Sequence, residues 1–312
     1  MDNIIRIGTR RSKLALWQAT HVADLLKKQG AQAEIVAIET TGDKVLNKSI
    51  AKIGSKGVFT EELEQMLHSG DIDIAVHSAK DLPSSLPEGL GIIAFTERES
   101  PEDVVVSYNR FLNFEDTSQK LVMGTSSTRR AAFIKHYYPK VRIVEVRGNL
   151  QTRMEKMKEG LCDGLMLAYA GVHRMGYEQH IITKMPMDKF TPQAGQGTLA
   201  VEAAERLDKK SYNLIRKAVN HVPTENRSLA ERGYLRRIDG GCSIPGFVIA
   251  HETSLGELHL HGGIIRINGK EVVRKDVTGA VQDAEALGAT LGEQVLQGGG
   301  AEILAEIREE SS

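Results

Sequence analysis

Short apolar runs alternate with amphipathic segments through the first two thirds of the chain. The runs 4–8, 33–38 and 72–77 have the length and the apolar content of buried strands. Apolar residues in the segments 14–25 and 61–68 recur at the spacing of one helical face. Strands that alternate with helices in this way are typical of parallel sheets with crossover connections, so the pattern predicts an α/β fold.

A second set of alternating elements begins near residue 103. The pattern predicts strands over 103–107, 121–124, 142–146 and 164–168, and helices from Ser127 and over 150–159. The polar, proline-broken stretch 97–103 predicts a crossing between two domains. Thr191 and Pro192 predict a second crossing.

The pattern changes beyond about residue 220. Strands are expected over 247–250, 258–267 and 272–277, followed by one long helix from Asp283. This order is typical of a small α+β domain. We therefore predict three domains, formed by residues 1–99 with 193–217, by residues 100–192, and by residues 218–312.

The composition is that of a globular protein, with 41% hydrophobic and 26% charged residues. A formal net charge of -1 excludes the strongly basic surface typical of nucleic-acid or membrane binding, so neither partner is expected. The chain shows no export signal and no apolar stretch of bilayer-spanning length, and we expect a cytoplasmic monomer. Cys162 and Cys242 are too few for a disulfide framework, so each is expected to be a free thiol.

Polar side chains gather just after the predicted strands. These side chains are Arg10, Ser12, Lys80, Asp81, Thr125, Ser127, Arg129, Arg130, Arg147 and, one helix start later, Arg174. Ligands of open α/β sheets bind beyond the carboxyl ends of the strands, so we expect these side chains to face a common site. Guanidinium groups bind carboxylates bidentately, and several in one site indicate a ligand with several negative groups. Any one of them is equally well explained as a solvated charge at a helix start.

The residues after two of these strands can be explained either by ligand binding and catalysis or by local structure alone. Arg129 and Arg130 lie in a first helical turn, where the helix dipole disfavours cations, so they indicate an anion at that end. Thr125 and Ser127 are explained by helix capping alone. Asp81 is suited to stabilise a developing cation or to shuttle protons, but an aspartate before a proline-containing loop is also common in turns.

Three further features stay open from the residues alone. The stretch Gly54 to Gly57 lacks the phosphate-loop pattern and is either a flap over the site or a surface turn. His259 and His261 share one face of a predicted strand without a third ligand nearby, so no metal site is expected. Cys242 follows two glycines, and a lone cysteine of this kind is more often inert than functional.

At these residues the sequence resembles the porphobilinogen deaminases, also called hydroxymethylbilane synthases. The matching motifs run in order along nearly the whole chain, at 9–12 with 14–19, 56–59, 75–83, 124–130, 147–149, 170–174, 195–197 and 240–242. The resemblance implies two domains like those of periplasmic binding proteins with a cleft between them, and a small third domain. It also implies a transferase that deaminates four porphobilinogen molecules and condenses them head to tail, releasing hydroxymethylbilane in haem biosynthesis.

The resemblance also implies particular roles for site residues. Cys242 would carry a dipyrromethane cofactor through a thioether, and Asp81 would be the catalytic carboxylate. The acetate and propionate groups of the cofactor would be held by Lys80, Ser12, Thr125, Ser127, Arg129, Arg130, Arg147 and Arg153. The substrate would be bound by Arg10, Arg174 and Phe59. The alternative from another class is a non-catalytic solute-binding protein for a polycarboxylate, which shares the two-domain architecture.

Overall fold

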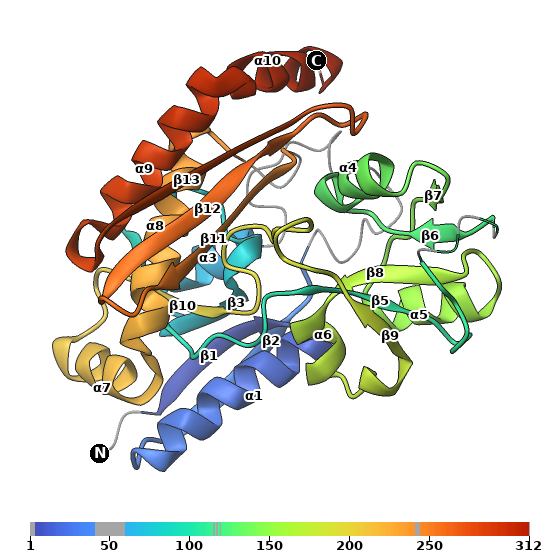
Figure 1. Ribbon diagram of the computed structural model, residues 1–312. Helices are drawn as coiled ribbons and strands as arrows, with labels where there is room; N and C mark the ends of the chain where they lie inside the picture. The colour runs from blue at the N-terminus through green and yellow to red at the C-terminus, as the bar shows by residue number, and fades with distance from the viewer. Residues whose placement is uncertain are drawn as a thin grey trace.

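The computed structural model describes residues 4–40, 60–114, 116, 118, 120–240 and 244–311. Its strands form two five-stranded sheets and one three-stranded sheet, each covered by helices (Figure 1). We call them the first, second and third sheet in chain order. The mixed α/β class predicted from the sequence is confirmed.

The first sheet has the strand order β2-β1-β3-β10-β4. Its strands are β1 (Ile5–Arg10), β2 (Ala33–Ile38), β3 (Ile74–Ser78), β4 (Leu90–Phe95) and β10 (Leu199–Ala204). Its helices are α1 (Lys13–Lys28), α3 (Glu61–Ser69) and α7 (Lys209–Val219), with the 3-10 turn η2 (Ala79–Asp81) after β3. Strands β1, β2 and β3 are parallel, whereas β10 runs antiparallel to both of its neighbours.

Helix α1 illustrates how local sequence forms these elements. The Ser12 hydroxyl accepts a hydrogen bond from the Ala15 backbone N–H and caps the helix start. Ala19, Val22 and Leu26 lie three and four residues apart, and all three are fully buried against the sheet. The helix therefore leaves the end of β1 at a defined angle, with its first turns near the carboxyl edge of the sheet.

The second sheet repeats this plan with the order β7-β6-β8-β5-β9. Its strands are β5 (Asp103–Val106), β6 (Val122–Gly124), β7 (Arg142–Val144), β8 (Gly164–Ala168) and β9 (Ile181–Lys184). Its helices are α4 (Thr128–Tyr137), α5 (Leu150–Lys158), α6 (Tyr169–Arg174) and the 3-10 turn η3 (Glu178–His180). Strands β6, β7 and β8 are parallel, and β5 is antiparallel to β8 and β9. The first and second sheets each contain one antiparallel strand, β10 and β5 respectively. Each of these strands follows a segment that crosses between the two sheets.

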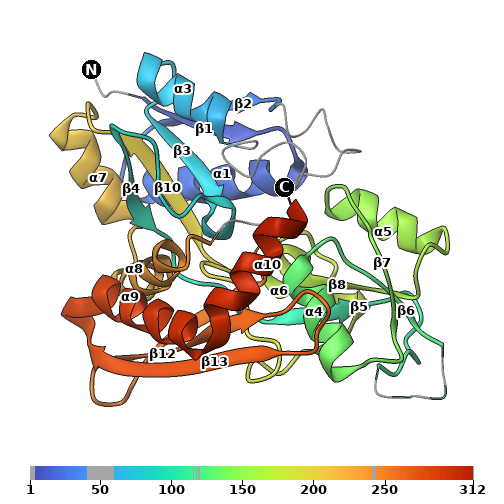
Figure 2. The same ribbon diagram turned by 90° about the horizontal axis from the view of Figure 1, so that it is seen from above.

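The third sheet is antiparallel, with the order β11-β12-β13. It is formed by β11 (Gly246–Glu252), β12 (Glu257–Ile265) and β13 (Val272–Ala280). The surrounding helices are α8 (Val222–Arg237), α9 (Ala284–Val295) and α10 (Ala301–Ser311), with the turns η4 (Val281–Asp283) and η5 (Leu296–Gly300). Figure 2 shows the three sheets as separate groups, with α8 between α9 and the first sheet.

Several predicted elements need correction. The single long helix expected from Asp283 is wrong, because Gly299 adopts a left-handed conformation at φ 109° and separates α9 from α10. The strand expected over 142–146 ends at Val144. The strands β4, β9 and β10 and the helices α7 and α8 lacked a sequence assignment. The sheet membership of the strands supports the three proposed domains, whose exact boundaries stay predictions.

Candidate functional site

Lys80 and Asp81 lie in a turn at the carboxyl end of β3. In a continuing strand these two neighbours would point to opposite faces, but β3 ends at Ser78 and the chain closes into the 3-10 turn η2. Lys80 is half-buried and Asp81 is exposed. The turn thus presents a cation and a carboxylate side by side at the edge of the first sheet.

Neighbouring segments hold this turn in place. Gln18 of α1 donates from Nε2 to the Ser78 hydroxyl at 2.9 Å, and Gln193 donates from Nε2 to the Lys80 carbonyl at 3.2 Å. Gly195 lies so close that a Cβ there would meet the backbone of Ala79 and Lys80 at 3.0 Å. The position of Lys80 and Asp81 is therefore set by α1 and by the second crossing, not by β3 alone.

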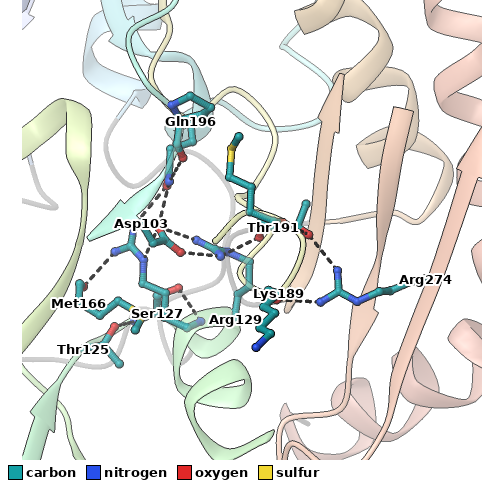
Figure 3. Close-up of polar contacts among 12 residues, drawn as sticks. Asp103, Thr125, Ser127, Arg129, Met166, Lys189, Thr191, Gln196 and Arg274 are labelled. Atoms are coloured by element: carbon teal, nitrogen blue, oxygen red, sulfur yellow. Dashed lines mark hydrogen bonds and ion pairs between the residues drawn. The ribbon is translucent and has the colours of Figure 1, made fainter. Parts of the chain in front are cut away.

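Asp103, the first residue of β5, joins two of the predicted arginines (Figure 3). Its Oδ2 lies 2.8 Å from Arg129 Nη1, and its Oδ1 lies 2.8 Å from Arg130 Nη2. The Gln196 side chain donates from Nε2 to the same Oδ1 at 2.9 Å. Asp103 is completely buried, so this cluster is a charged network within the protein interior.

This network corrects one step of the sequence argument. The anion indicated near Arg129 and Arg130 was expected to be a ligand, but Asp103 already supplies a carboxylate to both guanidinium groups. Burial alone would raise the pKa of Asp103, yet the two guanidinium groups hold that pKa far below its ordinary value. The chain itself therefore neutralises part of the arginine charge.

Arg129 is enclosed more completely than the sequence indicated. Its side chain is 3% exposed, and Nη1 also donates to the Thr191 carbonyl at 2.8 Å. The Thr191 hydroxyl in turn accepts a hydrogen bond from Arg274 of β13 at 2.9 Å (Figure 3). Arg129 thus connects the second sheet to the third through the second crossing.

Electrostatic coupling links the η2 turn with the second sheet. The pKa of Lys80 is lowered to about 8, mainly by burial and in addition by the charge of Arg130, while Asp81 acts in the opposite direction. Burial likewise lowers the pKa of Arg153 to about 10, with Arg130 acting in the same direction and Asp81 against it. The charges of Lys80 and Asp81 in the first sheet and of Arg130 and Arg153 in the second therefore act on one another.

The other cofactor residues predicted from the sequence lie at helix starts. Ser12 caps α1, and the Ser127 hydroxyl accepts a bond from the Arg130 N–H at 3.4 Å as the cap of α4. Thr125 is buried, and its hydroxyl accepts a bond from the Ser127 N–H at 3.1 Å. Arg147, two residues before the cap of α5, is paired with Glu145. Capping accounts for the local hydroxyl contacts, in agreement with the explanation by local structure alone.

The predicted substrate arginines come from both sheets. Arg10 ends β1 and is half-buried. Arg174 ends α6, and its Nη2 donates to the Gly197 carbonyl at 2.7 Å. Burial lowers the pKa of Arg174 to about 10. Phe59, Cys242 and the stretch 54–57 lie outside the described residues.

The remaining thiol and the paired histidines contribute no further chemistry. Burial raises the pKa of Cys162 to about 11, so its thiolate is scarce at neutral pH. His259 and His261 both contact Oδ1 of Asp276, at 3.2 Å and 2.8 Å. Within the described part of the chain, no three histidine, cysteine, aspartate or glutamate side chains could hold a metal ion together.

Three residues that hold the site in place were not predicted from the sequence. Asp103, Gln193 and Gln196 hold the arginines and the η2 turn, yet each acts across a long sequence separation. A weak signal existed for two of them, because Asp103 is a carboxylate opening an apolar run and Gln196 lies in a matched glycine motif. Neither signal identifies the partner, which only the folded chain brings close.

The described site carries an excess of positive charge. It holds five cationic side chains and three carboxylates. The cations are Lys80, Arg129, Arg130, Arg147 and Arg153, and the carboxylates are Asp81, Asp103 and Glu145. Buried cations without internal partners are costly, so this donor set fits a ligand that carries several carboxylates. Fold and site together fit the class of α/β proteins that bind a polyanionic ligand.

Comparison with known proteins identifies the family. The model of the porphobilinogen deaminase dipyromethane cofactor binding domain matches residues 5–212, and that of the porphobilinogen deaminase C-terminal domain matches residues 226–297. Porphobilinogen deaminase of Desulfosudis oleivorans is 52% identical over 99% of both chains. That of Cytophaga hutchinsonii is 52% identical over 99% of this chain and 98% of its own. The chain belongs to the porphobilinogen deaminase family.

Membership confirms the resemblance stated from the sequence, together with the transferase class and the dipyrromethane cofactor. The solute-binding alternative is not favoured. Among solved structures, the Bordetella pertussis BvgS periplasmic VFT2 domain is 15% identical, with a TM-score of 0.41 over 69% of this chain and 86% of that chain. No helix among the described residues is long and apolar enough to cross a membrane.

Proposed function

We propose that the residues around the η2 turn carry out porphobilinogen deamination and condensation, with Asp81 as the catalytic carboxylate. The observation that carries this proposal is the position of Asp81, which is exposed beside Lys80 in a turn held by Gln18 and Gln193. Its charge also acts on Arg153 of the second sheet. An exposed carboxylate beside cations can stabilise positive charge on a pyrrole as ammonia leaves. When bound, the dipyrromethane supplies the free α-carbon to which the next pyrrole is joined.

The cationic residues are assigned to binding. Lys80, Arg130, Arg147 and Arg153 are proposed to hold cofactor carboxylates, aided by Ser12, Thr125 and Ser127. Arg129, whose contacts are with Asp103 and Thr191, is proposed to act mainly by fixing the position of Arg130. Arg10, Arg174 and Phe59 are proposed to bind the incoming porphobilinogen.

Replacing Asp81 with Asn tests the catalytic assignment. The amide keeps the shape but cannot stabilise a developing cation, so we expect kcat to fall by roughly 100-fold or more. Steady-state assays with porphobilinogen, on protein whose cofactor content is verified by intact mass, measure the change. Glu88→Gln, at an exposed carboxylate seven residues further along the same loop, is the matched control and should retain full activity. An Asp81→Asn enzyme within a few fold of wild type contradicts the assignment.

The cofactor attachment is tested by intact mass. Cys242 is proposed as the thioether anchor, so wild-type protein should carry an adduct equal to two condensed pyrroles. Cys242→Ser should be folded and free of the adduct, whereas Cys162→Ser should keep it, because Cys162 is buried in the second-sheet core. An adduct that persists in Cys242→Ser rules the anchor out.

We further propose that the protein is a cytoplasmic monomer.

A further inference from the structure

Trp17 forms a contact between the unit built on the first sheet and the unit built on the second sheet. The proposed catalytic and binding roles do not include this contact. Trp17 lies in the first turns of α1, and the Cζ of Arg174, at the end of α6, lies over its ring at 5.4 Å from the centroid. Figure 1 shows α6 beside this end of α1. Trp17 is 37% exposed, so the indole is not a core residue but a face offered at the junction.

Arg174 is held from two directions. The guanidinium carbon lies over the indole ring, while Nη2 donates to the Gly197 carbonyl at 2.7 Å. That carbonyl belongs to a rigid segment, because Gly197 has φ +89° and a Cβ there would meet the Glu99 carbonyl at 2.3 Å. A cation–π contact uses the face of a guanidinium and leaves its other edge N–H groups free to bind a carboxylate.

Among the described residues, Arg174 and Arg153 lack the ion pair that three other arginines of the site form. Arg129, Arg130 and Arg147 each form an ion pair with a carboxylate. Among the described residues, no carboxylate forms an ion pair with Arg174, and Glu99 acts on it only at longer range. A largely buried guanidinium that is oriented but not neutralised is arranged to receive an external carboxylate.

We propose that Trp17 is a positioning residue for Arg174, holding its guanidinium face so that the free edge meets a carboxylate of the incoming porphobilinogen. This inference rests on the proposed function, in which Arg174 binds substrate. The competing explanation is that Trp17 only fills the α1–α6 contact, for which any large apolar side chain would serve. The two explanations differ in whether the effect of Trp17 depends on Arg174.

A double-mutant cycle on the holoenzyme separates them. Trp17→Leu keeps apolar bulk but removes the π face, so KM for porphobilinogen should rise about two- to fivefold with kcat nearly unchanged. Trp17→Phe, which keeps a weaker π face, should give a smaller rise. In an Arg174→Gln background, Trp17→Leu should have no further effect, since the interaction is already absent. Equal effects of Trp17→Leu in both backgrounds overturn the proposal.

Fluorescence provides a readout that does not depend on turnover. Trp17 is the one tryptophan of the sequence, so its emission reports on the surroundings of this ring, which are Arg174 and the stacked ring of His21. Porphobilinogen should change the emission of the wild-type holoenzyme and leave that of Arg174→Gln unchanged. Phe111→Leu, at a 91% exposed ring elsewhere in the second unit, is the control and should behave as wild type. An identical emission change in Arg174→Gln also overturns the proposal.

The cofactor adduct and the porphobilinogen consumption of the wild-type protein distinguish failure of this proposal from failure of the proposed function. If wild-type protein carries the cofactor adduct and consumes porphobilinogen while the cycle is additive, only the role of Trp17 is wrong. If wild-type protein lacks the adduct and does not consume porphobilinogen, the proposed function itself fails.

Discussion

Burial and neighbouring charge act together on Lys80. Its pKa is lowered to about 8, mainly by burial and in addition by Arg130, while Asp81 acts in the opposite direction. The ammonium is thus protonated below about pH 8 and loses its charge as the pH rises through that value. A bound carboxylate favours the charged form and moves the loss of charge to higher pH.

This titration predicts an alkaline limb in the activity profile. If Lys80 holds a cofactor carboxylate through its charge, kcat/KM of the holoenzyme should decline at a pH higher than about 8, because the bound carboxylate raises the pKa of Lys80. Lys80→Arg carries a guanidinium that stays protonated throughout this range, so its limb should move to higher pH even if its maximum rate is lower. A pH series of steady-state assays on both holoenzymes measures this. An unchanged limb in Lys80→Arg assigns the titration to another group.

At the scale of elements, one side chain of α8 joins both crossings to the third sheet. The Glu231 carboxylate lies 2.6 Å from Arg98 Nη1 in the first crossing. It also accepts hydrogen bonds from the Gly195 N–H of the second crossing at 2.7 Å and from the Ala250 N–H of β11 at 3.0 Å. A buried carboxylate with every partner satisfied fixes how the helix meets both crossings.

Removing this carboxylate should destabilise the whole fold. Glu231→Ala leaves the Arg98 guanidinium buried without its partner, which costs about 3–5 kcal/mol of unfolding free energy. Glu285→Gln breaks the Arg236–Glu285 pair on the exposed face of the same helix and should cost less than about 1 kcal/mol. Urea denaturation of both variants measures the difference. Equal small losses would show that the buried pair adds no stability.

At the scale of the whole molecule, charge is distributed unevenly. The formal net charge is -1, yet the site between the first and second sheets holds more cationic groups than carboxylates. A local positive region attracts an anionic substrate even on a nearly neutral protein. Attraction of this kind acts through solvent and is screened by salt.

Salt should therefore weaken substrate capture more than turnover. We expect KM for porphobilinogen to rise several-fold between low ionic strength and about 0.5 M salt, where the screening length falls to a few ångströms, with kcat changing less. Sucrose at matched viscosity is the control, since it slows diffusion without screening charge. A KM that responds equally to salt and sucrose argues against electrostatic capture.

Local patterning determined much of this protein from the sequence alone. The strands 33–38 and 164–168 were predicted with their observed bounds, and Ser127 was predicted as the start of its helix, because strand runs and helix caps depend on adjacent residues. The same motifs placed the arginines and Asp81 at strand ends and carried the family resemblance. These properties need only short stretches of chain.

Tertiary structure alone decided which charges meet. Asp103 reaches Arg129 across 26 residues and Gln196 across 93, and the antiparallel entry of β5 beside β8 is what brings it there. Lys80 and Asp81 turn out of their strand because α1 and the second crossing hold them. Partner choice at such distances depends on sheet order and burial, so no periodicity along the chain predicts it.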